Sequence, residues 1–186
     1  MSRIIRKGGE NHSPPLLTDE MTDKQKQDIT ILGLGNILMN DDGFGVHFIR
    51  WFENRWTLPD AVQIVEGGVM AYTLLEPVCN CRHLIVIDVL KIDDEPGAIY
   101  RFTQAEIEQK LPPPTSAHEV QFLDVLFKAE LLGEIPEVVF LCIVPMDFQD
   151  MNLELSPLLR EKFPVMEKFL LEELERHGVR PVKTHA

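Results

Sequence analysis

Short apolar runs recur along the chain from residue 28 onward, and amphipathic segments separate them. Each run holds four to seven residues, mostly aliphatic or β-branched, which favours buried strands over helices. We therefore predict strands over residues 29–32, 62–65, 83–88, 98–102 and 138–144.

The segments between these runs repeat their apolar residues at helical spacing. A stripe that begins at Val46 and extends to Trp56 predicts a helix after the turn at residues 41–43. Thr103 and Glu106 have the spacing of a capping box, which predicts a short helix after the fourth strand. Further helices are expected over residues 71–78, from about residue 118, and over residues 165–174, with Gly178 placed to end the last one.

Alternating strands and helices are typical of a largely parallel sheet that helices cover on both faces. The run at 98–102 is an exception, because only nine residues separate it from the run at 83–88. A parallel crossover needs a dozen or more residues, so the fourth strand is expected to be antiparallel. The predicted fold is an α/β class, three-layer α/β/α sandwich with a mixed five-stranded, mostly parallel sheet.

The length of 186 residues suits one domain. We assign residues 28–186 to a single α/β domain and residues 1–27, which include two glycines and two prolines before residue 16, to a flexible N-terminal arm. The net charge of −12 argues against nucleic acid and against an anionic membrane surface as partners.

Two further features bear on location. The chain has three cysteines with no Cys-x-x-Cys spacing, an odd number that favours a reducing, cytoplasmic location over a disulfide framework. No apolar run approaches the length of a membrane span, and the N-terminal segment contains no apolar stretch long enough for the hydrophobic part of a signal peptide.

Three polar side chains are expected to meet at the carboxyl edge of the sheet, where ligands bind in open α/β folds. Asp42 follows the first strand, Asp88 ends the third, and His118 follows the proline-rich loop 111–117. Taken singly, Asp42 could be only a helix N-cap and His118 only a packing residue. Asp88 is harder to explain in that way, because a carboxylate that closes an apolar strand is costly to bury without a cation or a donor.

Two carboxylates and one imidazole form a ligand set that suits zinc, nickel, manganese or iron, with positions left for water or a substrate group. Other kinds of site fit poorly. The glycines at 33 and 35 begin a dinucleotide fingerprint, but Leu38 stands where its third glycine is needed and two aspartates follow, which would repel phosphate. The chain contains no GxSxG elbow, P-loop or HExxH motif.

The residues around these positions resemble the hydrogenase maturation endopeptidases, which process the large subunit of [NiFe] hydrogenases. The similarity lies in four separated blocks, GLGNILMNDDGFGVHFIRWFENRW, EGG at 66–68, HLIVIDVL and TSAHEVQFLDVL. It extends from about residue 29 to residue 178. Members of that family often carry Glu where this chain has Asp42, and many carry Thr where it has Val69.

The resemblance implies that Asp42, Asp88 and His118 are both the metal-binding and the catalytic residues. It also implies a cytoplasmic endopeptidase that removes a C-terminal peptide from the nickel-loaded precursor of a [NiFe] hydrogenase large subunit. The nickel would be the recognition element and would come with the substrate, with zinc or cadmium as substitutes in vitro. Two alternatives stay open at this point: a non-catalytic metallochaperone that inspects nickel insertion, and a general metallohydrolase.

Overall fold

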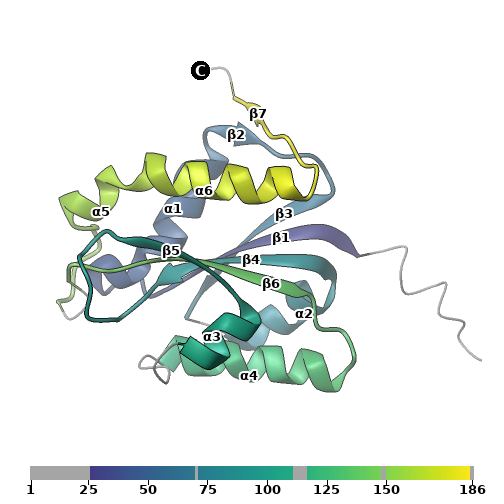
Figure 1. Cartoon of the computed structure of the whole chain (residues 1–186). Helices are drawn as coiled ribbons and strands as arrows, with labels where there is room; N and C mark the ends of the chain where they lie inside the picture. The colour runs from purple at the N-terminus through teal and green to yellow at the C-terminus, as the bar shows by residue number, and fades with distance from the viewer. Residues whose placement is uncertain (1–25, 70, 111–116, 148–149, 185–186) are drawn as a thin grey trace, which may run out of the picture.

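A central sheet with helices on both faces forms the body of the molecule (Figure 1). The computed structural model describes residues 26–69, 71–110, 117–147 and 150–184, without the side chains of residues 71–72, 108–110 and 117–119. The sheet has the strand order β3-β1-β4-β6-β5, and every neighbouring pair is parallel except β5 with β6. Its strands are β1 (Gln27–Leu34), β3 (Val62–Gly68), β4 (Cys81–Val89), β5 (Ile99–Thr103) and β6 (Glu137–Ile143).

This sheet confirms the predicted fold class, including the antiparallel fourth strand. Alternate residues of the central strands enter opposite cores, as Ile85 and Ile87 do on one face and Leu84 and Val86 on the other. Because both faces are buried, the strands read as continuous apolar runs in the sequence.

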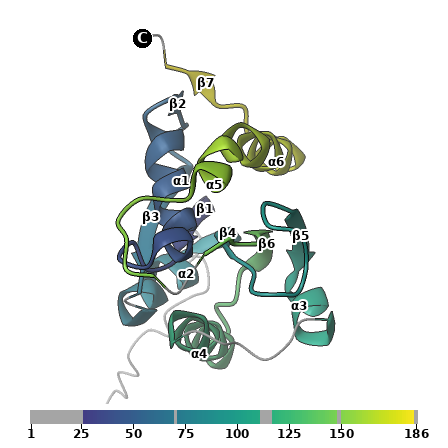
Figure 2. The same ribbon diagram turned by 90° about the vertical axis from the view of Figure 1, so that its left-hand side faces the viewer.

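The helices form two layers, one on each face of the sheet (Figure 2). One core contains side chains of α1 (Phe44–Glu53), α5 (Pro157–Glu161) and α6 (Phe163–Arg176). The other contains side chains of the 3₁₀ turn η4 (Ala71–Leu74), α2 (Leu75–Cys79), α3 (Gln104–Lys110) and α4 (Ala117–Leu131). A further 3₁₀ turn, η3 (Asn40–Gly43), leads directly into α1.

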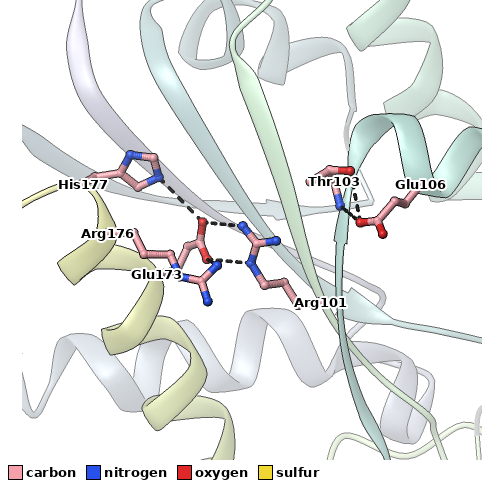
Figure 3. Close-up of polar contacts among 6 residues, drawn as sticks. All are labelled: Arg101, Thr103, Glu106, Glu173, Arg176 and His177. Atoms are coloured by element: carbon pink, nitrogen blue, oxygen red, sulfur yellow. Dashed lines mark hydrogen bonds and ion pairs between the residues drawn. The ribbon is translucent and has the colours of Figure 1, made fainter.

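Two helix signals in the sequence are confirmed at the level of single residues. The N–H of Thr103 donates to the Glu106 carboxylate at 3.0 Å, as a capping box requires, at the start of α3 (Figure 3). Gly178 follows the end of α6 with φ of +76°, the left-handed conformation that favours glycine after a helix.

The prediction for Trp56 was wrong. Helix α1 ends at Glu53, and Trp56 begins the short strand β2 (Trp56–Thr57), which pairs antiparallel with β7 (Val182–Lys183). Its indole Nε1 donates to Glu167 Oε1 of α6 at 2.6 Å. Trp56 therefore keeps the apolar contacts that its spacing predicted, although it reaches them from a strand.

A buried ion pair joins α6 to the edge strand β5 (Figure 3). Arg101 Nε and Nη2 donate to the two carboxylate oxygens of Glu173 at 2.7 and 3.0 Å, and only 2% of Glu173 is exposed. Burial alone would raise the pKa of Glu173. The hydrogen bonds from Arg101 and the charges of Arg101, Arg176 and His177 outweigh that effect and leave the pKa below its ordinary value.

The predicted N-terminal arm, residues 1–27, lies almost wholly outside the described residues. Within the described ranges, no helix combines the length and the apolar character needed to cross a membrane.

Candidate functional site at the carboxyl edge of the sheet

Two glycines bring the start of α1 into contact with the ends of the central strands. A Cβ on Gly45 would lie 2.2 Å from the carbonyl oxygen of Ile87 in β4 and 2.4 Å from that of Leu34 in β1. Gly35, just after β1, has φ of +119°, and a Cβ there would lie 1.8 Å from the Asp42 carbonyl oxygen. This close packing, which only glycine allows, fixes η3 over the carboxyl ends of β1 and β4.

Asp42 is therefore placed at this edge with its carboxylate turned inward. The residue is 5% exposed. Its Oδ2 accepts the backbone N–H of Asn36 at 3.1 Å, and its Oδ1 lies 2.8 Å from Nζ of Lys91. The ammonium offsets the cost of burying this carboxylate.

Asp88 lies at the same edge, as the penultimate residue of β4. It is 6% exposed and stands in register with Cys142 of β6. Its Oδ1 accepts the N–H of Val89 at 2.7 Å. Lys91, the partner of Asp42, follows only three residues later, so the two carboxylates and this ammonium belong to one end of the sheet.

His118 lies in the first turn of α4, the helix that leads to β6. Its side chain is outside the described residues, so its place beside Asp42 and Asp88 stays a prediction. Among the side chains that are described, no group of three His, Cys, Asp or Glu could hold a metal ion. The carboxylates of Asp42 and Asp88 are of the kind that binds divalent cations. Such a cation would need further ligands, from His118 or from a substrate.

Asp41 has a different part in the site, which the sequence did not reveal. The residue is fully buried, with 0% exposed, and its carboxylate accepts three backbone N–H groups. Ser156 donates to Oδ1 at 2.7 Å, and Met146 and Asp147 donate to Oδ2 at 3.0 Å each. Asp41 thus ties the segment after β6 to the turn that holds Asp42.

Lys91 was also missed, although it offered a signal. It is the first basic residue after the aspartate that ends a buried strand, and such a strand end was already expected to need a cation. No comparable signal marked Asp41, because its three donors are backbone groups more than one hundred residues away.

His47 of α1 and the three cysteines are further titratable groups. His47 is half-buried, and burial together with the charge of Arg50 lowers its pKa. Cys79, Cys81 and Cys142 form no disulfide, and burial raises the pKa of Cys79 and of Cys81. A raised pKa leaves a thiol less reactive near neutral pH, so Cys79 and Cys81 are poor nucleophiles.

Comparisons with known proteins point to one family. The family model described as hydrogenase maturation protease matches residues 46–173. The hydrogenase expression/formation protein HupD of Bradyrhizobium diazoefficiens is 31% identical over 160 residues, which cover 85% of this chain and 83% of that protein. The hydrogenase 2 maturation protease of Escherichia coli K12 is 30% identical over 160 residues, which cover 85% of this chain and 97% of that protein.

Solved structures agree with these sequence matches. The hydrogenase maturating endopeptidase HybD from E. coli superposes with a TM-score of 0.79 at 28% identity, covering 84% of this chain and 97% of that one. The [NiFe] hydrogenase maturation protease HybD from Thermococcus kodakarensis gives a TM-score of 0.65 at 27% identity, with coverage of 79% and 98%.

Proposed function

Because the chain belongs to the hydrogenase maturation protease family, we propose that it removes a C-terminal peptide from the nickel-loaded precursor of a [NiFe] hydrogenase large subunit. The chain is a hydrolase of the endopeptidase type, as its relatives are named. The proposal adds that nickel is the recognition element and that the reaction takes place in the cytoplasm.

One observation carries the proposal: Asp42, in the turn after β1, and Asp88, near the end of β4, are buried carboxylates at the carboxyl edge of two neighbouring strands. Burying two negative charges is costly unless positive charge accompanies them. Lys91 supplies an ammonium on Asp42. Carboxylates are also ligands for divalent cations, and nickel held by the precursor is one that arrives together with the scissile bond.

Asp42, Asp88 and His118 are the residues that would hold this nickel. As a Lewis acid, the nickel would polarise the scissile carbonyl or the attacking water. The residues of the chain position the peptide bond next to the metal, which turns hydrolysis into a reaction between groups already in place. One carboxylate accepts a proton as water adds to the carbonyl carbon, the C–N bond breaks, and that proton passes to the departing amine.

A cleavage assay tests the proposal. The protein is mixed with nickel-loaded and with nickel-free precursor, and the large subunit is weighed by mass spectrometry. Only the loaded precursor should lose its C-terminal peptide, and Asp42→Asn, Asp88→Asn and His118→Ala should abolish the loss. Asp28→Asn is the matched control, since Asp28 pairs with Arg82 on the exposed surface. Equal cleavage of both precursors, or cleavage of neither, would show that the proposal is wrong.

A related assay tests the alternative that the chain is a general metallohydrolase. Zinc and cadmium, which favour similar donors, are added to the protein with short peptides in place of the precursor. We expect no turnover of these peptides, because the proposed reaction depends on the metal that the precursor holds.

A further inference from the structure

Lys91 is unusual among the lysine and arginine side chains of the ion pairs in the described residues, because its side chain is largely buried. Only 14% of that side chain is exposed, and its partner Asp42 shows 6%. Most other ion pairs in the described residues lie at the surface, such as Arg50 with Glu66, where both side chains are 45% exposed. Lysine is seldom buried unless it is paired, and Asp42 supplies such a partner.

The ammonium takes the oxygen that a metal ion would need. Asp42 Oδ2 already accepts the N–H of Asn36, and Lys91 Nζ lies 2.8 Å from Oδ1. A divalent ion that binds Asp42 through Oδ1 must displace the ammonium or bind next to it. Both routes weaken the binding of a free ion, the first through the lost ion pair and the second through repulsion between like charges.

We propose that Lys91 is a specificity-determining residue, which excludes free divalent ions from the site and yields only to nickel that the precursor presents. This inference rests on the proposed function. The lysine side chain is suited to the task, because its ammonium is a point charge on a flexible four-carbon chain and can swing away from Asp42. The Asn36 N–H belongs to the backbone and cannot leave in the same way.

The precursor has an advantage over a free ion. A free ion must displace Lys91 with the free energy of a few metal–ligand bonds. Nickel in the precursor enters the site together with the protein surface that carries it, so contacts remote from the metal contribute to moving the ammonium. The resting enzyme then stays metal-free in a cell that contains other divalent ions.

Calorimetric titration of the intact protein with nickel chloride alone tests this inference. Lys91→Met removes the ammonium and keeps an unbranched side chain, and Lys91→Gln is a second variant with a hydrogen-bonding end. Both should bind nickel at least ~10-fold more tightly than the wild type does. Lys91→Arg keeps the positive charge and should stay near the wild type.

Lys26→Met is the matched control. Lys26 pairs with Glu134, with side chains 23% and 36% exposed, next to the first residue of β1 and so at the opposite edge of the sheet. This change removes one positive charge and one ion pair away from the site, and the nickel affinity should not change. A rise in affinity equal to that of Lys91→Met would mean that net charge decides, and would overturn the inference.

Cleavage provides the second readout. With nickel-free precursor and added nickel chloride, Lys91→Met should bind the free metal in the protease, and its preference for loaded over nickel-free precursor should fall relative to the wild type. If Lys91→Met and Lys91→Gln both bind nickel with the affinity of the wild type, the proposed role of Lys91 is overturned, even if the wild type cleaves loaded precursor. Absence of wild-type cleavage would instead overturn the proposed function, and the titration would still report on Lys91.

Discussion

Asp41→Asn tests whether the two adjacent aspartates of η3 have different roles, with Asp41 stabilising the fold and Asp42 serving the site. The Asp41 carboxylate accepts N–H groups from Ser156 at Oδ1 and from Met146 and Asp147 at Oδ2, at 2.7, 3.0 and 3.0 Å. An asparagine keeps one acceptor oxygen and places an NH₂ group at the other position. If the oxygen serves Met146 and Asp147, the NH₂ group faces the N–H of Ser156, and two donors meet.

The expected loss in the free energy of unfolding follows from these hydrogen bonds. Leaving a buried donor unpaired costs about 1–3 kcal/mol, and the two remaining bonds lose the strengthening that a charged acceptor provides. We therefore expect Asp41→Asn to lower the free energy of unfolding by about 2–4 kcal/mol. Asp42→Asn should lower it by about 1 kcal/mol or less, because its oxygen can still accept the Asn36 N–H and Lys91 can turn toward water.

Urea unfolding followed by the fluorescence of Trp51 and Trp56 measures both values. The cleavage assay is run on the same variants. Asp42→Asn should lose its activity although its stability is nearly unchanged. The reasoning that Asp41 holds the segment after β6 would be refuted if Asp41→Asn were as stable as the wild type. It would also be refuted if both variants lost the same free energy of unfolding.

Three further outcomes are expected. Arg101→Met leaves Glu173 buried with weaker partners and should cost about 3 kcal/mol of stability, part of which an added Glu173→Met recovers. Because the pKa of Glu173 is lowered from 4.5, its ion pair stabilises the fold above about pH 4.5 and is lost as the pH falls further, so acid should destabilise the wild type more steeply than Glu173→Gln in pH-dependent unfolding. Gly45→Ala, whose Cβ would overlap two strand carbonyls, should cost about 3 kcal/mol in thermal or urea unfolding; a loss below about 1 kcal/mol would show that α1 can lift off the sheet.

The sheet could be predicted because each central strand is buried on both faces, and this burial leaves a continuous apolar run in the sequence. The antiparallel strand followed from the short connection before residue 98, which a parallel crossover cannot span. Strand β2 could not be predicted, since two residues carry no periodicity and depend on β7, which lies more than one hundred residues away.

For two of the predicted site residues, the position in the fold could also be predicted, for related reasons. Asp42 comes after one strand that the pattern identifies and Asp88 lies near the end of another, and the rule for open α/β sheets places both at one edge. Lys91 and Asp41 were not predicted, because their roles depend on partners that only the fold brings near. Lys91 reaches Asp42 across 49 positions of the sequence, and Asp41 binds backbone groups 105 to 115 positions away.

The two adjacent aspartates suit the exchange of cations that we propose, because they have different partners. In a 3₁₀ turn, consecutive side chains point about 120° apart, so Asp41 and Asp42 face different neighbours. Asp41 is held by backbone groups that cannot move without the segment after β6, and this fixes the backbone of Asp42 as well. Under the proposed role of Lys91, its side chain would leave Asp42 while the Asp42 carboxylate stays in place for the incoming metal.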